Sequence, residues 1–283
     1  VAVCISCHDV HAIRAVKDQM AWTYPTKVAE TCSQCHGDAD YMKEYKIPTD
    51  QLEKYKQSIH YETLTKRGDL ASPTCSSCHG SHGAAPPGID SVANVCSHCH
   101  VVTAELFAKS PHGPAFAELG MPACVTCHGN HDVTIASDAM LIGGEATPCA
   151  TCHEANSVPL KKAAELRTMI RGLSYQIDQA EAILTKAEHA GMEVGAPRFE
   201  LLAAKESLIK ARTETHSLKI EKVKAATDPG FIVAEKSLTS GQDLLTELLF
   251  RRKGLVAAML VIGAVLVGLF LKIREVDRRR GLD

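Results

Sequence analysis

The chain has 283 residues and a formal net charge of −2, and 45% of its residues are apolar, 23% charged and 5% aromatic. This balance excludes collagen-like, fully disordered and strongly basic nucleic-acid-binding proteins. All 12 cysteines lie between Cys4 and Cys152, and the last 131 residues contain none. The cysteine-rich half has too few large apolar side chains for an ordinary core, so we expect something other than side chains to fill it.

The cysteines form six pairs, each with two residues between its members and a histidine directly after it. In chain order we call them motif 1 (4–8), motif 2 (32–36), motif 3 (75–79), motif 4 (96–100), motif 5 (124–128) and motif 6 (149–153). This spacing is typical of covalent haem c attachment, in which two thiols bond the vinyl groups and the histidine binds the iron. The sequence therefore predicts six haem c groups. Their thioether cysteines are Cys4, Cys7, Cys32, Cys35, Cys75, Cys78, Cys96, Cys99, Cys124, Cys127, Cys149 and Cys152, and their proximal histidines are His8, His36, His79, His100, His128 and His153.

Two other uses of paired cysteines fit this pattern less well. Structural zinc sites also take CxxC pairs, but they do not require a histidine at one fixed offset from every pair. A disulfide framework of a small secreted domain would not place that histidine six times either. Haem attachment also predicts a location outside the cytoplasm, on the periplasmic side of the membrane.

Eight further histidines compete for the second axial position of six irons. Three of them stand three residues after a proximal histidine, and so short a tether cannot reach the opposite face of the same haem, so we expect them to ligate neighbouring haems. Two more lie in Ser-x-His segments that recur before motifs 3 and 5. The predicted distal ligands are therefore His11, His82 and His131 from the first group and His60 and His112 from the second.

The sixth distal ligand is left open by these patterns. His98 lies inside motif 4, and His216 lies on an apolar helical seam where a packed histidine is expected. His189 lies close to a turn of the helical half, and we assign it as the additional ligand. Other possibilities are no sixth ligand at all or a methionine, namely Met20, Met42, Met121 or Met140.

An internal repeat organises the first half of the chain. Residues 32–82 and 96–131 each contain two motifs, a Ser-x-His segment and a Cys-His-Gly-x-His run, which indicates duplication of a two-haem unit. Motifs 1 and 6 flank this pair. We therefore predict a mainly α protein whose irregular, haem-packed domain covers residues 1–155.

The second half has long, alanine-rich, charged segments with breaks near residues 190–197 and 228–230. These breaks predict three helices in a bundle or coiled-coil stalk over residues 156–250, which also offers an oligomerisation surface. The expected apolar seams are Leu166, Ile170, Leu173, Ile177, Ala180, Leu184 and Ala187 in the first helix, Leu202, Ile209, His216, Ile220 and Val223 in the second, and Phe231, Ala234, Leu238, Gly241, Leu245 and Leu248 in the third.

Residues 254–271 form an uncharged apolar run with basic residues on both sides. Its length and flanks predict a transmembrane anchor, and the larger basic cluster after it places a tail of residues 272–283 in the cytoplasm. The run contains no histidine, so we expect it to anchor the chain without binding haem. Because the sequence starts at Val1 rather than at methionine, we expect further residues to precede it in the encoded protein.

Charge differs between the halves. Residues 1–153 contain 10 basic and 16 acidic residues, so this half carries −6, whereas the remainder carries +4. An acidic surface repels nucleic acid and steers a basic redox partner toward the haems. We expect the partners to be other redox proteins or subunits of a respiratory membrane complex, with the lipid bilayer holding the anchor.

The six motifs, the paired-haem repeats and the Cys-His-Gly-x-His runs resemble the multihaem c-type cytochromes with doubled CxxCH motifs. This resemblance implies a chain of closely spaced haems, mostly bis-histidine ligation and electron transfer. A membrane-bound member is also similar to the quinol dehydrogenases of nitrite and nitrate reductase systems, which carry their anchor at the N-terminus. The long C-terminal helices resemble the hydroxylamine oxidoreductase and pentahaem nitrite reductase group. Quinol oxidation and a reductase with one open iron are therefore the alternative functions.

Overall fold

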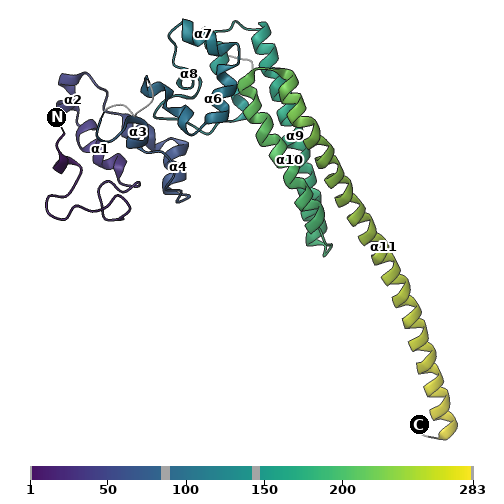
Figure 1. Cartoon of the computed structure of the whole chain (residues 1–283). Coiled ribbons are helices and arrows are strands. Elements are labelled where there is room, and N and C mark those ends of the chain that lie inside the picture. Colours follow the sequence, from purple (N-terminus) through teal and green to yellow (C-terminus); the bar gives the residue numbers. More distant parts are fainter. Residues whose placement is uncertain (1, 84–89, 142–146, 282–283) are drawn as a thin grey trace. The chain divides into compact units, whose positions relative to one another are not determined.

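The structure, a computed structural model, describes residues 2–83, 90–141 and 147–281 (Figure 1). The described residues form helices and connecting turns without a β-strand, so the prediction of a mainly α fold is confirmed. The chain divides into two compact units. We call Val1–Arg167 with Thr213–Lys222 the haem-motif unit, and Thr168–Arg212 with Val223–Asp283 the helical unit.

The haem-motif unit consists of short helices joined by turns. Two of its helices, α1 (Val28–His36) and α5 (Cys75–His79), each end at the histidine of a motif. The unit also contains the turn η6 (Thr215–Ser217), which connects two helices of the second half. Its other elements are η1 (Cys4–Ser6), α2 (Ala39–Met42), η2 (Lys43–Tyr45), α3 (Gln51–Lys56), α4 (Ile59–Thr65), η3 (Val92–His98), α6 (Val101–Ala108), α7 (His112–Glu118), α8 (Val125–His128), η4 (Asp138–Leu141) and η5 (Pro148–Thr151).

Few large apolar side chains are buried among the described residues that carry the motifs. Those that are buried before α9 are Ala21, Val28, Ala29, Met42, Tyr55 and Leu64. The Tyr55 hydroxyl donates a hydrogen bond of 2.8 Å to the Pro73 carbonyl, which ties α3 to the segment that leads into motif 3. Side chains alone therefore supply only a small core here, as expected for a domain that packs around bound groups.

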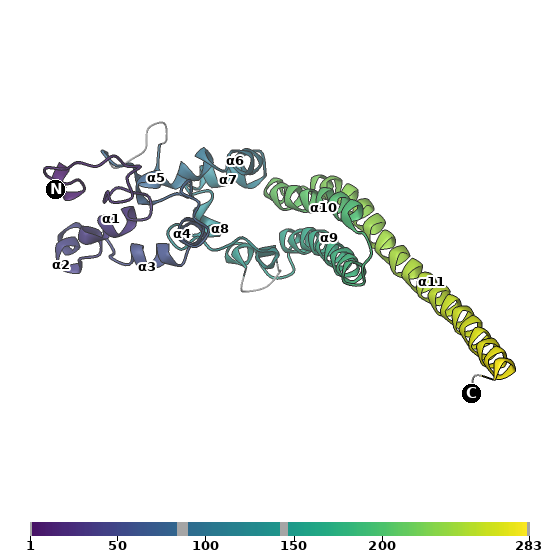
Figure 2. The same cartoon turned by 90° about the horizontal axis from the view of Figure 1, so that it is seen from below.

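Three long helices, α9 (Val158–His189), α10 (Gly195–Glu214) and α11 (Ile220–Arg280), make up most of the second half. Within the helical unit they lie side by side, as both views show (Figures 1 and 2). The predicted heptad seam of α9 is confirmed, because all of its members are buried. Steps of four and three residues place these side chains on one face of the helix, where they meet α10 and α11.

The seam predicted for the second helix was wrong by one position at Leu202 and Ile209, whereas its last member, Val223, is buried as predicted. Leu202 is 47% and Ile209 63% exposed, whereas the residues before them, Leu201 and Leu208, are buried with Ala204 and Ala211. In α11 the buried positions include Val223, Ala226, Thr227, Ala234 and Ser237. Small and polar residues therefore form much of this seam, which a search for large apolar residues in the sequence does not detect.

The predicted break at residues 228–230 was also wrong, since α11 continues through Pro229. Gly230 faces the bundle so closely that an added Cβ atom would lie 2.8 Å from Leu173 Cδ2 and from Ser207 Cβ. Packing of this glycine against α9 and α10 keeps the helix continuous despite the proline. The chain instead reverses at η6, after which Leu218 has a φ of 54°.

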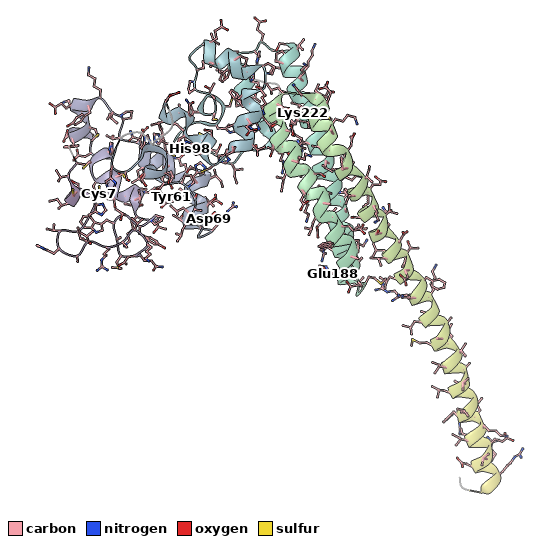
Figure 3. All side chains as sticks on the ribbon, viewed as in Figure 1. Cys7, Tyr61, Asp69, His98, Glu188 and Lys222 are labelled. Carbon is pink, nitrogen blue, oxygen red and sulfur yellow. The ribbon has the colours of Figure 1, made fainter. Side chains whose placement is uncertain are left out.

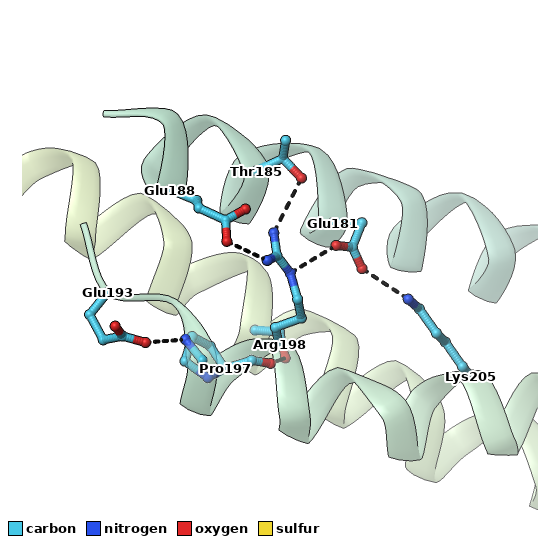
Figure 4. A network of polar contacts seen from close by, with 9 residues as sticks. Glu181, Thr185, Glu188, Glu193, Pro197, Arg198 and Lys205 are labelled. Atoms are coloured by element: carbon cyan, nitrogen blue, oxygen red, sulfur yellow. Dashed lines mark hydrogen bonds and ion pairs between the residues drawn. The ribbon is translucent and has the colours of Figure 1, made fainter. Parts of the chain in front are cut away.

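The break predicted at residues 190–197 is confirmed, because α9 ends at His189 and Gly191 takes a φ of 86°. Beyond this turn Arg198 joins α10 to α9 (Figure 4). Its guanidinium group bonds Glu181 Oε1 at 3.1 Å and Glu188 Oε1 at 2.9 Å. Lys205 Nζ reaches the other oxygen of Glu181 at 2.9 Å, so one carboxylate holds two cations of α10.

The predicted transmembrane run, residues 254–271, lies within α11. An 18-residue window of this helix has a mean hydropathy of 2.7, and none of that window is buried inside the structure. One long apolar helix at the C-terminus is compatible with a single-pass membrane anchor. Residues 282–283 of the predicted tail lie outside the described residues, as does Val1.

Candidate haem sites

Each described motif is built on a helical turn. In motif 1 the His8 N–H donates to the Cys4 carbonyl at 3.0 Å, and the corresponding bond recurs in motifs 4, 5 and 6 at 2.9–3.1 Å. The motifs of α1 and α5 are helical throughout. Residues three and four apart share one face of a helix, so both thiols and the imidazole of a motif are presented together. Figure 3 marks Cys7 of motif 1 and His98 of motif 4.

Cysteines of consecutive motifs are close enough to influence each other. Cys32 and Cys35 of motif 2 both raise the pKa of the Cys7 thiol in motif 1, together with burial, which has the larger effect. The same relation holds for Cys78 with the two cysteines of motif 4 and for Cys127 with those of motif 6. Motif 1 therefore adjoins motif 2, motif 3 adjoins motif 4, and motif 5 adjoins motif 6.

Two thiol hydrogen bonds connect these three pairs. Cys75 of motif 3 bonds Cys32 of motif 2 and lowers the pKa of Cys32 to about 7. Cys124 of motif 5 bonds Cys96 of motif 4 and lowers the pKa of Cys96 to about 6. The six motifs thus adjoin one another in their order along the chain, from motif 1 to motif 6.

Histidine rings from distant parts of the sequence lie opposite each other in four pairs. Their ring centroids are 6.3 Å apart for His8 and His82, 6.0 Å for His79 and His131, 6.0 Å for His153 and His112, and 6.2 Å for His128 and His216. The two ring planes of each pair lie within 11–25° of parallel. Since bonds from imidazole to a metal are about 2.0–2.1 Å long, this separation leaves room for one metal ion between two ring nitrogens.

A fifth relation links His60 to motif 4. The His100 imidazole adds to the effect of burial in lowering the pKa of His60. In each of the four ring pairs one histidine belongs to a motif and the other stands outside the motifs. His82 and His131 each lie opposite the motif two positions back, and His112 lies opposite motif 6. The same kind of electrostatic effect links the proximal His36 and His79, so the effect on His60 shows that it lies near motif 4 and does not by itself show a ring pair.

At two glycines with positive φ the backbone turns, and this turn directs two of the distal histidines away from their own motifs. Gly80 and Gly129, which directly follow a proximal histidine, have φ values of 77° and 73°. A residue with a Cβ atom is strained in this conformation, so glycine is favoured where the chain must turn there. The turn carries His82 and His131 away from their own motifs and toward His8 and His79.

Buried serines hold the backbone beside the other two distal histidines, His60 and His112. Ser58 caps α4, accepting from the Tyr61 N–H at 3.1 Å and donating to the Tyr55 carbonyl at 2.6 Å. Ser110 accepts from the His112 N–H at 3.2 Å and is equally buried. In both copies of the Ser-x-His repeat the serine therefore lies at the start of a helix whose first turn contains the distal histidine, and in α4 it is the N-cap residue.

His216 was not among the assigned ligands, and the structure places it opposite His128 of motif 5. Its Nδ1–H donates to the Thr213 carbonyl at 3.0 Å, which leaves Nε2 with the lone pair that a metal requires. The turn around it is fixed, because Ser217 Oγ donates to the Glu214 carbonyl at 2.7 Å and Leu218 is left-handed. The left-handed position after η6 was not recognisable from the sequence, since leucine is uncommon there.

Burial favours the neutral form of several of these imidazoles. It is the largest cause of a lowered pKa for His60, His112, His128 and His131. In His112 and His128 the opposite ring, from His153 or His216, adds to the effect. Only a neutral imidazole has a free lone pair, so this environment favours metal binding.

The remaining predicted ligands are not brought to a partner ring. His11 and His36 are exposed, and neither forms a parallel imidazole pair within the described residues. His189 is exposed at the end of α9 in the helical unit, also without a partner ring among the described residues, so its assignment stays a prediction. Motif 2 is thus the motif whose second axial ligand the structure does not indicate.

The donor set fits haem better than the alternatives. The twelve cysteines form no disulfide among the described residues, and the described part of the chain contains no group of three or more metal-binding side chains of the kind that zinc takes. Pairs of imidazoles and pairs of thiols recur instead. An apolar hollow of about 580 Å³ adjoins Cys124 of motif 5 and is lined in part by Ala104, Phe107 and Gly113, which suits a flat apolar group held by that cysteine.

Comparison with known families agrees with this chemistry. The family model for the doubled CXXCH motif matches residues 1–41, which contain motifs 1 and 2. This match supports a multihaem c-type cytochrome-like family and covalently bound c-type haem. Searches of curated proteins and of solved structures found no match to this chain.

Proposed function

We propose that this chain is a membrane-anchored hexahaem cytochrome c that conducts electrons along six haems in the order of its motifs. The observation that carries the proposal is the adjacency of the motifs: α1 of motif 2 contacts α5 of motif 3, α5 contacts η3 of motif 4, and α8 of motif 5 contacts η5 of motif 6. The interactions of Cys7 with motif 2 and of Cys96 with motif 5 complete this order. Haem c supplies reversible one-electron chemistry when it is bound at such motifs. The protein holds the groups in sequence and sets their surroundings.

Imidazole pairing supports a role in electron transfer rather than in substrate binding. Five motifs have a second histidine opposite or beside the proximal one, namely His82, His131, His60, His216 and His112 for motifs 1, 3, 4, 5 and 6. When haem is bound, two histidines would ligate its iron and leave no position for another ligand. Because each distal histidine comes from outside the motif it faces, the ligand pairs also bind neighbouring segments of the chain together.

The haem motifs and the apolar run also support a cellular location for the protein. Haem c attachment outside the cytoplasm and the apolar run at residues 254–271 together support a periplasmic haem-motif unit with a cytoplasmic C-terminus. We infer that the chain serves a respiratory assembly as an electron-carrying subunit. The net charge of −6 over residues 1–153 favours a partner with a basic docking surface, with association that weakens as salt rises.

One observation favours a second candidate function. Motif 2 has no imidazole pair among the described residues, so its iron is the one that an oxidoreductase would leave open to a small substrate. His36 is exposed, and an enclosed pocket is the usual setting for such a substrate. Electron transfer therefore remains the proposal that the described residues favour.

The test is electron paramagnetic resonance of the oxidised full-length protein in detergent, with parallel measurement of haem per chain. The proposal expects six haems and low-spin signals from the five paired motifs. His216→Ala should convert one low-spin haem to high spin. His189→Ala tests the other candidate ligand, and it should leave the spectrum unchanged if His216 rather than His189 ligates the haem of motif 5. Fewer than six haems, or a spectrum in which His189→Ala and not His216→Ala creates the high-spin signal, would contradict the ligand assignment.

A separate measurement addresses the enzymatic candidate. A high-spin signal that persists in the wild-type protein and shifts on addition of nitrite or hydroxylamine would support an oxidoreductase. For the quinol alternative, protein in liposomes is treated with a reduced quinol analogue, and haem reduction is followed by absorbance. Rapid reduction without added partner protein would support direct quinol oxidation.

A further inference from the structure

His112, the distal histidine opposite motif 6, lies in a cluster of aromatic rings. Its ring centroid is 5.3 Å from that of Phe116 and 6.5 Å from that of Phe107. The two phenyl rings meet edge to face, with centroids 5.5 Å apart and planes at 72° to each other. The His153 imidazole of motif 6 lies 6.0 Å from the same histidine. The distal imidazole is therefore packed against phenyl rings as well as paired with a proximal imidazole.

The backbone around this cluster is held by hydrogen bonds within the chain. Phe116 follows His112 by four residues in α7, which places both side chains on one face of the helix. Phe107 comes from the last turn of α6, and the buried Ser110 accepts from the His112 N–H between the two helices. Where α7 ends, the Phe116 carbonyl accepts from the Met121 N–H at 2.9 Å. The polypeptide itself therefore orients these rings.

The two copies of the internal repeat differ at the position of the phenyl contact. Four residues after its distal histidine the first copy has Leu64, which is buried, whereas the second copy has Phe116. Eight residues after the histidine the copies have Gly68 and Gly120, with φ values of 71° and 62°, so their backbones correspond. Leucine fills an apolar site but offers no ring plane that could hold an imidazole at one angle. The phenyl ring thus gives His112 a constraint that leucine does not provide.

The residue five positions before the distal histidine differs between the copies as well. In the first copy it is Tyr55, whose hydroxyl bonds the Pro73 carbonyl. In the second copy it is Phe107, which has no hydroxyl and lines the hollow beside Cys124 of motif 5. Its contact with Phe116 therefore connects the ring cluster to the surroundings of motif 5.

We propose that Phe116, supported by Phe107, is a positioning residue that holds the plane of the His112 imidazole and thereby sets the reduction potential of the haem at motif 6. This inference rests on the proposed function, because it requires haem at motif 6 with His112 as its second ligand. Residues that contact a metal ligand orient it and tune the metal, and burial around a haem affects its potential. The planes of His112 and His153 are 22° apart, and the angle between two imidazole ligands determines the shape of the low-spin ferric spectrum.

The potential at motif 6 matters for its neighbour in the series. Helix α8 of motif 5 contacts η5 of motif 6, so the haems of these two motifs exchange electrons in the proposed function. A change of potential at motif 6 alone changes the driving force of that step. The two copies of the repeat would then contribute to haems of different potential through the same kind of ligand.

The experiment measures spectra and potentials of the full-length protein in detergent. Phe116→Leu introduces the residue of the first copy, and Phe116→Tyr keeps the ring. Electron paramagnetic resonance of the oxidised protein, a spectroelectrochemical titration and haem per chain are recorded for each. Phe116→Leu is expected to keep six haems, to change the g values of one low-spin signal and to displace one midpoint potential. Phe116→Tyr should retain the wild-type values of both.

Two further variants make the result specific. His112→Ala identifies the signal of motif 6, since loss of this ligand should convert that haem to high spin. Phe199→Leu is the matched control, because it removes a phenyl ring that is 75% exposed on α10. It should leave every signal and every potential as in the wild type.

Unchanged g values and potentials in Phe116→Leu would overturn the proposal, as would a change confined to signals other than the one that His112→Ala removes. If Phe116→Leu loses haem, Phe107→Leu decides: a changed motif 6 signal with six haems supports the proposal, and an unchanged one overturns it. Loss of haem in both variants would show a role in folding and overturn it as well. Fewer than six haems in the wild type, or a His112→Ala variant in which every haem keeps its wild-type signal, would instead contradict the proposed function.

Discussion

The two units of this protein are stabilised in different ways. In the helical unit, side chains from all three helices are buried, such as Leu173 of α9, Leu201 of α10 and Ala234 of α11. In the haem-motif unit the described residues bury few large apolar side chains, while thiol and imidazole pairs recur from one end to the other. A cofactor-packed region therefore depends on covalent attachment and ligation, and the bundle depends on shape and apolar area. Substitutions matched between the units should separate these two kinds of stability.

Loss of haem attachment at a central motif should have the largest effect. Replacing both cysteines of motif 3, Cys75→Ser with Cys78→Ser, removes a group that adjoins motifs 2 and 4. We expect a loss of about 4–5 kcal/mol or more, as when a protein loses a structural metal or disulfide. Limited proteolysis and haem stoichiometry measure it. Ser76→Ala, between the same cysteines, should keep full haem content, and a protease-resistant double variant would contradict the expectation.

A cavity in the bundle should have the next largest effect. Leu173 is fully buried in α9, so Leu173→Ala should lower the free energy of unfolding of the helical unit by about 2–5 kcal/mol. Leu202→Ala is the control, because this residue is 47% exposed and should lose less than about 1 kcal/mol. Denaturation followed by circular dichroism compares them. Equal losses would mean that the seam of α10 includes Leu202 after all.

Adding a side chain at Gly230, where the helices are in close contact, should lower the free energy of unfolding by a smaller amount. A Cβ atom there would meet Leu173 and Ser207, so Gly230→Ala should destabilise the bundle by about 1–3 kcal/mol. Gly254 lies in the same helix with no atom near its added Cβ. Gly254→Ala should be neutral or stabilising, since alanine is the better helix former. Thermal melting of both variants tests this, and a stabilised Gly230→Ala would show that α11 does not pack there.

Loss of the polar network between α9 and α10 should have the smallest effect on thermal stability. Arg198→Ala removes its ion pairs with Glu181 and Glu188, which are partly open to solvent, and should lower Tm by about 2 °C or less. Arg198 holds the pKa of Glu188 below its ordinary value of 4.5, so the stabilisation is present above pH 4.5 and is lost as the pH falls below it. The Tm difference between wild type and variant should therefore shrink in acid. Lys236→Ala, at an exposed pair with Glu200, is the control and should leave Tm unchanged.

The sequence by itself determined the features that depend on short spacing. The six motifs, the three-residue tethers of His82 and His131, the turn near Gly191 and the apolar run at residues 254–271 all follow from covalent geometry or local pattern. The seam of α9 was predictable for the same reason, because large apolar residues at regular steps along one helix indicate which of its faces is buried.

Tertiary structure alone decided the pairings and the course of α11. His128 and His216 are separated by the whole of α9 and α10, so only the folded chain reveals that His216, rather than His189, faces motif 5. The break expected at Pro229 is overridden by packing of Gly230 against Leu173. In both cases a long-range contact outweighs the local signal, because burial and ligation contribute more free energy than backbone propensity does.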